Sequence, residues 1–287
     1  MTMNFSQHNS INLNSILKYN KNDNFITKSY NDFVTGKYRF EREKNFYLHC
    51  LKIKYKNVPR IYKIDDINLS IDIEYIEKDL IFENNKDILI TYFCNFINSI
   101  NKNVIKSNFT TAQEAVLTTD SLINNIDLRI NRLINIKKPL YEILILYRNL
   151  KKNYFSMNCK AGDLILNPSD FGVHNIIINE CIPYFIDFEY AGIDSLQKTY
   201  FDFLLHPKNN LIKDFEENYY SIQNESNFKL DYNESELKIV KNLYIIWWII
   251  RLFESIEKLN VQIDNEYLIN ERINNINNFM ELLDYDL

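Results

Sequence analysis

The scarcity of glycine limits the folds open to this chain more than any other feature. Its 287 residues include only four glycines, Gly36, Gly162, Gly172 and Gly192, and no two of them are closer than ten positions. A GxGxxG dinucleotide fingerprint or a Walker A loop needs glycines a few residues apart, so neither motif can occur. Any nucleotide site must therefore be built without a glycine-rich phosphate loop.

The composition is typical of a globular protein with a large core, because 46% of the residues are hydrophobic and 25% are charged. The net charge is -5, and Lys and Arg are scattered along the chain, which argues against the basic surface that a nucleic-acid partner needs. The most apolar run, residues 243–250, is far shorter than the ~20 residues that cross a bilayer. We therefore expect a buried helix there, with neither a nucleic-acid nor a membrane partner.

The cysteines and the N-terminal residues indicate the cellular compartment in which the protein is expected. The four cysteines form no CxxC pair, and the polar residues 1–14 lack the apolar stretch of a signal peptide. Reduced thiols are typical of the cytoplasm, so we expect a cytoplasmic protein. No oligomeric state is predicted.

The first quarter of the chain predicts short strands and one helix. One hairpin is expected from Ser15–Tyr19 and Asn24–Tyr30, and another from Arg60–Ile64 and Leu69–Tyr75. A helix is expected over Tyr38–Leu51. Its apolar stripe recurs at helical spacing and contains one carboxylate, the members being Glu43, Phe46, Tyr47, Cys50 and Leu51.

Two charged side chains are expected to face the core of this region. Ile26, Lys28 and Tyr30 alternate along one strand and therefore share a face. Glu43 lies on the apolar stripe of the helix, and an inward carboxylate needs a partner. The sequence therefore predicts that Lys28 and Glu43 pair.

Beyond Glu77 the pattern changes to long helices. They are expected over Lys86–Asn101, Thr111–Ile136, Pro139–Phe155, Leu211–Ile222, Glu234–Leu259 and Asn265–Leu283. Strands followed by helices predict an α+β fold, and the length suits one large domain or two lobes. We expect a small β-rich lobe over residues 1–77 and a larger, mainly helical lobe over residues 78–287.

A short β segment interrupts these helices and carries polar residues at its open end. Residues 164–166, 176–178 and 183–186 predict strands, and a polar loop over 167–175 joins the first two. Asn175 enters the hairpin and Asp187 leaves it, so both reach one edge beside the loop that carries Asp170. Carboxylate and amide oxygens suit Mg²⁺. Phosphoryl transfer needs such ligands and a separate Asp near the acceptor hydroxyl.

Three runs of residues carry a resemblance to a known family. They are NPSDFGVHN from Asn167, FIDFEYAG from Phe185 and DFLLHP from Asp202. The chain resembles the aminoglycoside phosphotransferase and choline-kinase-like family, a small-molecule branch of the protein-kinase-like fold. It is most similar to a bacterial subgroup of phosphotransferases with a Pro-Ser-Asp-Phe-Gly catalytic loop, over roughly residues 12–207.

The resemblance implies a role for each matching residue. Asp170 would be the catalytic base, and Asn175 and Asp187 would hold Mg²⁺. Lys28, held by Glu43, would bind the α- and β-phosphates of ATP, with GTP as an alternative nucleotide. The other candidates are Glu74 and Ile76 at an adenine-binding hinge, Asp202 as a brace of the catalytic loop, and Glu114 and Glu189 as substrate contacts.

The sequence also departs from the family pattern and leaves alternatives open. Pro168 and Ser169 stand where most members have His-Gly, so other groups must brace the loop. Glu114 is equally explained as a first-turn helix residue, and Glu189 as the exposed side of a turn. His174, beside the catalytic loop, is more readily explained as a hydrogen-bonded group than as a ligand or base.

The resemblance implies an enzyme that moves the γ-phosphoryl group of ATP to a hydroxyl of a small molecule. A sugar-like metabolite is the first acceptor to expect, and an aminoglycoside or a choline-like amino alcohol is the second. Two other classes remain open. One is a pseudokinase that acts as a binding module, and the other is a metal-dependent hydrolase that uses the same carboxylates.

Overall fold

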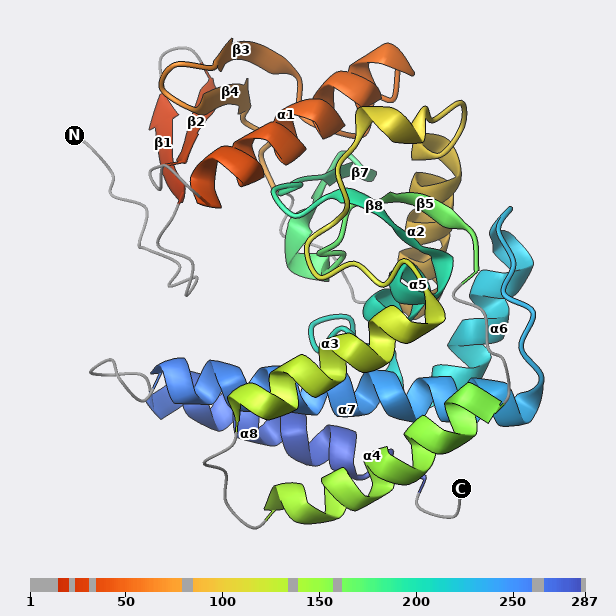
Figure 1. Cartoon of the computed structure of the whole chain (residues 1–287). Helices are drawn as coiled ribbons and strands as arrows, with labels where there is room; N and C mark the ends of the chain where they lie inside the picture. Colours follow the sequence, from red (N-terminus) through yellow and green to blue (C-terminus); the bar gives the residue numbers. More distant parts are fainter. Residues whose placement is uncertain are drawn as a thin grey trace.

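The computed structural model describes residues 15–20, 24–30, 35–78, 85–133, 139–156, 162–259 and 266–284. Figure 1 shows a small sheet with one helix at the N-terminal end and a mainly helical C-terminal part, as expected of the α+β class. The lobe boundary at residue 77 stays a prediction, because residues 79–84 lie outside the described ranges.

The N-terminal part is an antiparallel sheet packed against one helix. Both predicted hairpins form, and the strand order is β1-β2-β4-β3. The bounds are β1 Ser15–Asn20, β2 Phe25–Tyr30, β3 Ile61–Asp65 and β4 Ser70–Glu74. On β2 the side chains of Lys28 and Tyr30 are buried, as the period-two pattern predicts.

Helix α1, Thr35–Lys52, lies across this sheet and confirms most of the predicted stripe (Figure 1). Glu43, Phe46 and Tyr47 are at most 1% exposed. Leu51 was wrongly placed on the buried stripe, because it is 69% exposed. A step of one residue past the buried Cys50 turns the side chain by about 100°, which takes it off the buried face.

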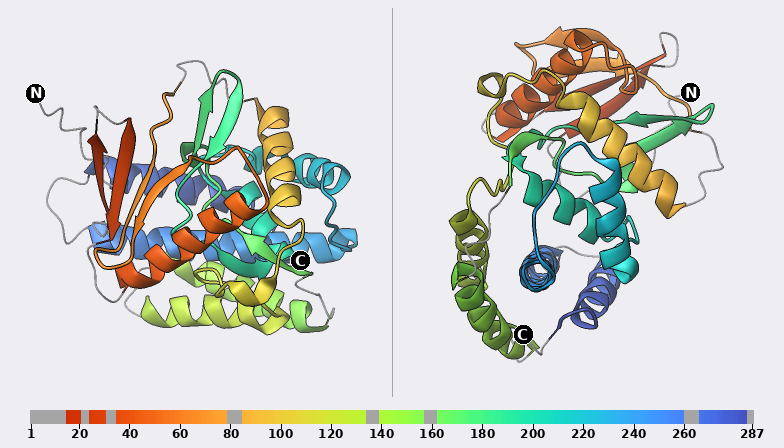
Figure 2. Two further views of the ribbon diagram at one scale, coloured as in Figure 1. Left: turned by 90° about the horizontal axis from the view of Figure 1, so that it is seen from above. Right: turned by 90° about the vertical axis from the view of Figure 1, so that its right-hand side faces the viewer.

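The C-terminal part is built from helices around a long central one. The helices are α2 Lys86–Ile100, α3 Thr119–Arg132, α4 Pro139–Ser156, α5 Leu196–Leu205, α6 Phe215–Glu225, α7 Glu234–Leu259 and α8 Glu266–Met280. Helix α7 packs against α3, α4, α5 and α8. The right-hand view of Figure 2 looks along α7, with α4 and α8 on opposite sides of it.

The apolar run of α7 is buried, as predicted. Every residue from 243 to 250 is at most 8% exposed. Among the described helices, none combines the length and the apolar character that crossing a membrane would require.

Two predicted helix starts are wrong. The helix expected from Thr111 begins at Thr119, because Thr110 and Ala112 exchange backbone hydrogen bonds with Ile193 and hold this segment extended. Thr118 then caps α3 through a capping box with Ser121. The helix expected from Leu211 begins with a 3₁₀ turn, η3 Ile212–Asp214, and continues as α6.

The central β segment forms as predicted, with one additional strand. Strand β5 Leu164–Asn167 pairs with β8 Gly192–Ser195, which the sequence analysis did not identify, nor did it identify α5. Strands β6 Ile176–Asn179 and β7 Ile182–Phe185 form the predicted hairpin. Glu180 and Cys181 both have positive φ, as the tight type I′ turn requires.

Aromatic stacking joins the N-terminal part to this β segment. Phe46 of α1 stacks on Phe188 with ring centroids 4.1 Å apart, and Phe96 of α2 stacks on Phe185 at the same distance. Asn57 adds a pair of hydrogen bonds, because its backbone oxygen accepts from Phe185 and its side chain donates to the carbonyl of Pro183. The segment that leads to Asp187 is therefore fixed between α1 of the N-terminal part and α2 of the C-terminal part.

Candidate functional site

A buried lysine binds carboxylates from both parts of the molecule. Lys28 Nζ lies 2.7 Å from Glu43 Oε2 on α1 and 2.5 Å from Asp187 Oδ1 after β7. Glu189 Oε2 lies 3.4 Å from the same nitrogen. The pairing of Lys28 with Glu43 that the periodicity predicted is therefore present.

Further contacts hold the Glu43 carboxylate in place. The Tyr30 hydroxyl donates to Oε2, and the Phe188 backbone N–H donates to Oε1 at 3.4 Å. Burial raises the pKa of Glu43, although Lys28 opposes that rise. Burial alone would lower the pKa of Lys28, but Asp187 and Glu43 raise it well above its ordinary value. Lys28 is thus a fixed cation at neutral pH.

Glu189 is buried and belongs to the same cluster, so its alternative as the exposed side of a turn is wrong. Arg39 Nη1 lies 3.4 Å from Glu189 Oε1, and the Arg39 guanidinium packs over the Tyr190 ring. Glu189 Oε2 is buried without a hydrogen-bond partner among the described residues. Three carboxylates therefore face two cations, Lys28 and Arg39.

This cluster fits a hard cation. The carboxylates of Glu43, Asp187 and Glu189 offer oxygens within 4.8 Å of one another. Asp187 is the most open of the three, with 39% of its side chain exposed. Its φ of 66° is a strained value for a non-glycine residue, of the kind that is found at functional sites.

Asn175 lies beside Asp187, at the edge where the sequence placed both. The Ile186 N–H donates to the Asn175 carbonyl at 3.0 Å, so Asp187 is the next residue along. The Asn175 side-chain nitrogen donates to the Asp170 carbonyl at 3.0 Å, which leaves the amide oxygen as the atom able to bind a metal. The three residues of the predicted catalytic constellation are therefore neighbours.

Asp170 lies in the polar loop between β5 and β6, against two imidazoles. His206 Nε2, at the end of α5, lies 3.2 Å from Asp170 Oδ1, and His174 Nε2 lies 3.8 Å from Oδ2. Burial alone would raise the pKa of Asp170, but its contacts with His174 and His206 hold it well below the ordinary value. Asp170 is therefore a carboxylate at neutral pH.

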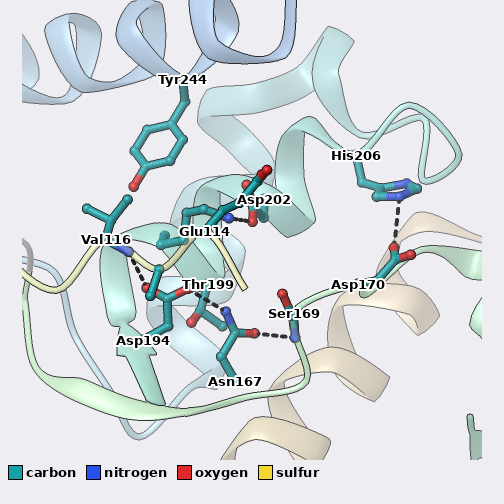
Figure 3. Close-up of polar contacts among 12 residues, drawn as sticks. Glu114, Val116, Asn167, Ser169, Asp170, Asp194, Thr199, Asp202, His206 and Tyr244 are labelled. Carbon is teal, nitrogen blue, oxygen red and sulfur yellow. Dashed lines mark hydrogen bonds and ion pairs between the residues drawn. The ribbon is translucent and has the colours of Figure 1, made fainter. Parts of the chain in front are cut away.

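Buried asparagines brace the loop where Pro168 and Ser169 depart from the family pattern. Asn167 Oδ1 accepts the Ser169 N–H at 2.9 Å, and Asn167 Nδ2 donates to Asp194 at 3.3 Å. Figure 3 shows Asp194 between Asn167 and Val116, whose backbone N–H it also accepts. Burial raises the pKa of this fully buried carboxyl group.

Asn209 holds the other end of the loop. Its side-chain nitrogen donates to the carbonyls of Phe171 and Phe203, both at 2.9 Å, and its oxygen accepts the Val173 N–H at 2.9 Å. Loop and α5 terminus are thereby tied together.

Figure 3 draws Asp202 and Glu114 between Ser169 of this loop and Tyr244 of α7. Asp202 forms an ion pair with Lys198, one turn earlier on α5, while the loop contacts come from His206 and Asn209. Glu114 forms an ion pair with Arg129 and lies before α3, so its alternative as a first-turn helix residue is wrong. The roles assigned to both residues stay predictions.

The predicted hinge leads out of β4. The Glu74 N–H is already bonded to the Arg60 carbonyl at 2.8 Å. Ile76 lies in the segment that follows, which has no regular secondary structure. The adenine contacts assigned to Glu74 and Ile76 stay predictions.

The sequence analysis missed several residues of the site. Tyr30, Arg39 and His206 contact candidate residues directly. Asn167 and Asn209 hydrogen-bond the loop that carries Asp170. Arg39 lies one helical turn before Glu43, so its spacing could have identified it. His206 was not singled out, because nothing local to the end of α5 points to a loop more than thirty residues earlier.

Comparison with known proteins shows similarity in structure only. No family model matches the sequence, and no curated protein matches it. Among solved structures, a choline/ethanolamine kinase family protein from Mesorhizobium loti superimposes with a TM-score of 0.64 at 13% identity, covering 94% of this chain and 86% of that chain. The chain has the protein-kinase-like fold.

Other small-molecule kinases superimpose equally well. Choline kinase LicA from Streptococcus pneumoniae gives a TM-score of 0.60 at 15% identity, over 94% of this chain and 89% of that chain. The aminoglycoside phosphotransferase APH(2")-IIa, in complex with gentamicin, gives a TM-score of 0.62 at 15% identity. The superposition covers 93% of this chain and 88% of that chain. The expected resemblance is confirmed at the level of the kinase-like fold.

Proposed function

We propose that this chain is a small-molecule kinase that transfers the γ-phosphoryl group of a nucleoside triphosphate to a hydroxyl. The observation that carries this proposal is the convergence of Lys28, Glu43 and Asp187 beside Asp170 and Asn175. A phosphate-binding cation, metal ligands and a separate carboxylate are the parts that phosphoryl transfer requires.

The nucleotide would bind between the N-terminal sheet and the β6–β7 hairpin. Lys28 would bind the α- and β-phosphates, and Glu43 would hold Lys28 in place while Ile76 and Glu74 meet the adenine. ATP is the first nucleotide to test and GTP the second. Similar proteins have been solved with ADP, with ATP and streptomycin, and with GDP and kanamycin.

Asp187 and Asn175 would hold Mg²⁺, and the buried Glu189 adds negative charge behind them. Bound there, Mg²⁺ would neutralise charge on the phosphates. Asp170 would accept a hydrogen bond from the acceptor hydroxyl through Oδ2, the carboxylate oxygen that does not pair with His206, and would take its proton as the phosphoryl group moves. Its lowered pKa keeps it ready as a carboxylate.

The acceptor that we propose first is a hydroxyl of a sugar-like metabolite, because the subgroup that the sequence resembles is more similar to sugar-directed enzymes than to choline kinases. Aminoglycosides and choline-like amino alcohols are the second class, and proteins of similar fold carry those names. We also propose a cytoplasmic location, which agrees with the free thiols of Cys50, Cys94 and Cys181.

The test is a transfer assay with γ-labelled ATP and panels of sugars, aminoglycosides and amino alcohols. Asp187→Ala is expected to abolish transfer without unfolding the protein. Asp66→Asn is the matched control, because Asp66 is an exposed carboxylate that pairs with Lys44 on the surface. Near wild-type transfer by Asp187→Ala would contradict the assignment.

Two other outcomes separate the remaining classes. Binding of nucleotide without transfer to any acceptor would favour a pseudokinase. Release of phosphate from ATP without an acceptor would favour a hydrolase, which has no need of the Lys28 and Glu43 pair.

A further inference from the structure

His206 is held in one orientation at the end of α5. Its backbone caps the helix, since its N–H donates to the Phe203 carbonyl, and its ring lies at 82° to the Trp248 ring with centroids 5.6 Å apart. Only 12% of its side chain is exposed. Both ring nitrogens have partners: Nε2 faces Asp170 at 3.2 Å, and Nδ1 faces the Lys208 backbone N–H at 3.2 Å.

These two partners decide which nitrogen carries the proton. A neutral imidazole has one N–H donor and one acceptor nitrogen. The Lys208 N–H can only donate, so Nδ1 of His206 must accept and Nε2 must carry the hydrogen. Burial lowers the pKa of His206, which favours this neutral form at neutral pH.

We propose that His206 is a positioning residue for Asp170: the Lys208 amide fixes its tautomer, and Nε2–H then holds Asp170 Oδ1. The consequence for catalysis rests on the proposed function. With Oδ1 held, Oδ2 is the oxygen that faces an acceptor hydroxyl. His174 does not take this role, because its Nε2 lies 3.8 Å from Oδ2, beyond a normal hydrogen bond, and its side chain is 46% exposed.

Gly172 makes this arrangement sterically feasible. A Cβ at this position would lie 2.6 Å from Cε1 of His206 and 2.4 Å from Nδ1 of His174. Asn209 ties the loop to the end of α5 through three hydrogen bonds. The donor and the carboxylate therefore belong to one braced unit, as precise orientation of a base requires.

A metal site is the competing interpretation of the same residues. Asp170, His174 and His206 offer ligand atoms within 4.8 Å of one another. A metal-bound histidine, however, coordinates through an unprotonated nitrogen and donates its other N–H to an oxygen. Nδ1 of His206 faces a donor instead, so Nε2 is protonated and is a hydrogen-bond donor.

The first part of the test is ¹⁵N-imidazole NMR of the whole protein without metal or nucleotide. The His206 signals are assigned by their loss in His206→Gln, and we expect a proton on Nε2 and none on Nδ1 at neutral pH. A proton on Nδ1 alone would overturn the proposal and favour the metal site. This result does not depend on activity, so it is separate from any failure of the proposed kinase function.

The second part compares two variants in the transfer assay. His206→Leu keeps the apolar packing but removes the donor, and it is expected to lower kcat by roughly ten- to a hundredfold, as loss of a hydrogen bond to a charged group predicts. The KM for nucleotide is expected to stay the same. His206→Gln has an amide donor of similar reach and is expected to restore most of kcat.

Each other result of this comparison counts against the proposal. Unchanged kcat in His206→Leu would overturn it. Equal losses in the two variants would indicate a structural role rather than a lost donor, and would overturn it too. If the wild type transfers phosphoryl groups to no acceptor, the proposed function fails, and the NMR result still decides the tautomer.

Discussion

Lys28 is the residue on which the charges of the site depend. It binds Glu43 and Asp187, so it links α1 to the segment after β7 that would carry the metal. Because Lys28 and Glu43 are both buried, any change in one leaves the other without full compensation. Asp187 alone is partly open, and it is therefore the member free to exchange Lys28 for a ligand.

Glu43→Gln tests this dependence. Gln is close in size to Glu but loses the charge, so Lys28 keeps only the carboxylates after β7 and is expected to shift toward Asp187. We expect kcat/KM for the nucleotide to fall at least tenfold and the free energy of unfolding to fall by about 1–2 kcal/mol, measured by kinetics and by urea unfolding. Glu41→Gln is the control, since Glu41 pairs with Lys44 on the exposed face of the same helix. Equal kcat/KM in both variants would contradict the role of Glu43.

Lys198 predicts a pH dependence of stability. This side chain is 3% exposed, and burial lowers its pKa from 10.5 to about 8 despite the nearby carboxylates. Between these two values the unfolded chain binds more protons than the folded protein, so the free energy of unfolding rises with pH. The rise from one group is at most about 1.4 kcal/mol per pH unit.

The measurement is urea unfolding of the wild type and of Lys198→Met from pH 8 to pH 10. Lys198→Met is expected to be less stable throughout, because it leaves Asp202 without its partner, and to lose the rise with pH. The same slope in both proteins would mean that Lys198 does not titrate in this range.

At the scale of elements, the sequence predicted those strands and helices whose positions depend on residues close to them in the chain. The hairpins and α1 follow from alternation and helical spacing, so Lys28 and Glu43 could be placed on buried faces from the sequence. Strand β8 and the extended residues 110–112 could not, because they bond to each other across about 80 residues of chain and β8 also pairs with β5, about 30 residues earlier. Asn209 and His206 were missed for the same reason, since polar residues after a helix are common and their partners lie in a distant loop.

Gly192 shows this long-range dependence, and Gly192→Ala tests it. A Cβ here would lie 2.5 Å from the Ala112 nitrogen and 2.6 Å from the Thr110 carbonyl oxygen, both of them backbone atoms. We expect the free energy of unfolding to fall by about 1–3 kcal/mol, as overpacking predicts, and transfer activity to fall with it. The activity is expected to fall because β8 carries Asp194, which anchors the loop of Asp170 through Asn167.

Gly36→Ala is the matched control for this prediction. Its Cβ would lie 3.3 Å from the Tyr30 carbonyl oxygen, and alanine favours the helix in which Gly36 lies. We expect a change in the free energy of unfolding below about 1 kcal/mol. A Gly192→Ala protein as stable as this control would show that residues 110–112 can move away without loss.

At the scale of the whole molecule, the candidate site lies where the two parts meet. The stacked pairs Phe46–Phe188 and Phe96–Phe185 fix the Asp187 segment between α1 and α2. A ligand that binds Lys28 and Asp187 together would therefore bind both parts at once and stabilise the folded chain as a unit.

Thermal unfolding of the whole chain with Mg²⁺ and ATP tests this consequence first. A ligand at about 100 times its dissociation constant adds about 2.7 kcal/mol of stability, which corresponds to roughly 5 °C in a protein of this size. We expect this shift with Mg²⁺ and ATP together, and a smaller one when either is omitted, because the phosphates then lack the metal or the metal lacks the phosphates.

Asp187→Asn is the variant that decides where the ligand binds. Each variant is compared with its own ligand-free melting temperature, because removing one of three crowded carboxylates changes the stability of the free protein as well. The shift is expected to vanish in Asp187→Asn and to persist in the exposed control Asp66→Asn. The reason is that Asp187 contacts Lys28, whereas Asp66 pairs with Lys44. A full shift in Asp187→Asn would place the nucleotide elsewhere and would remove the basis for assigning Lys28 and Asp187 to it.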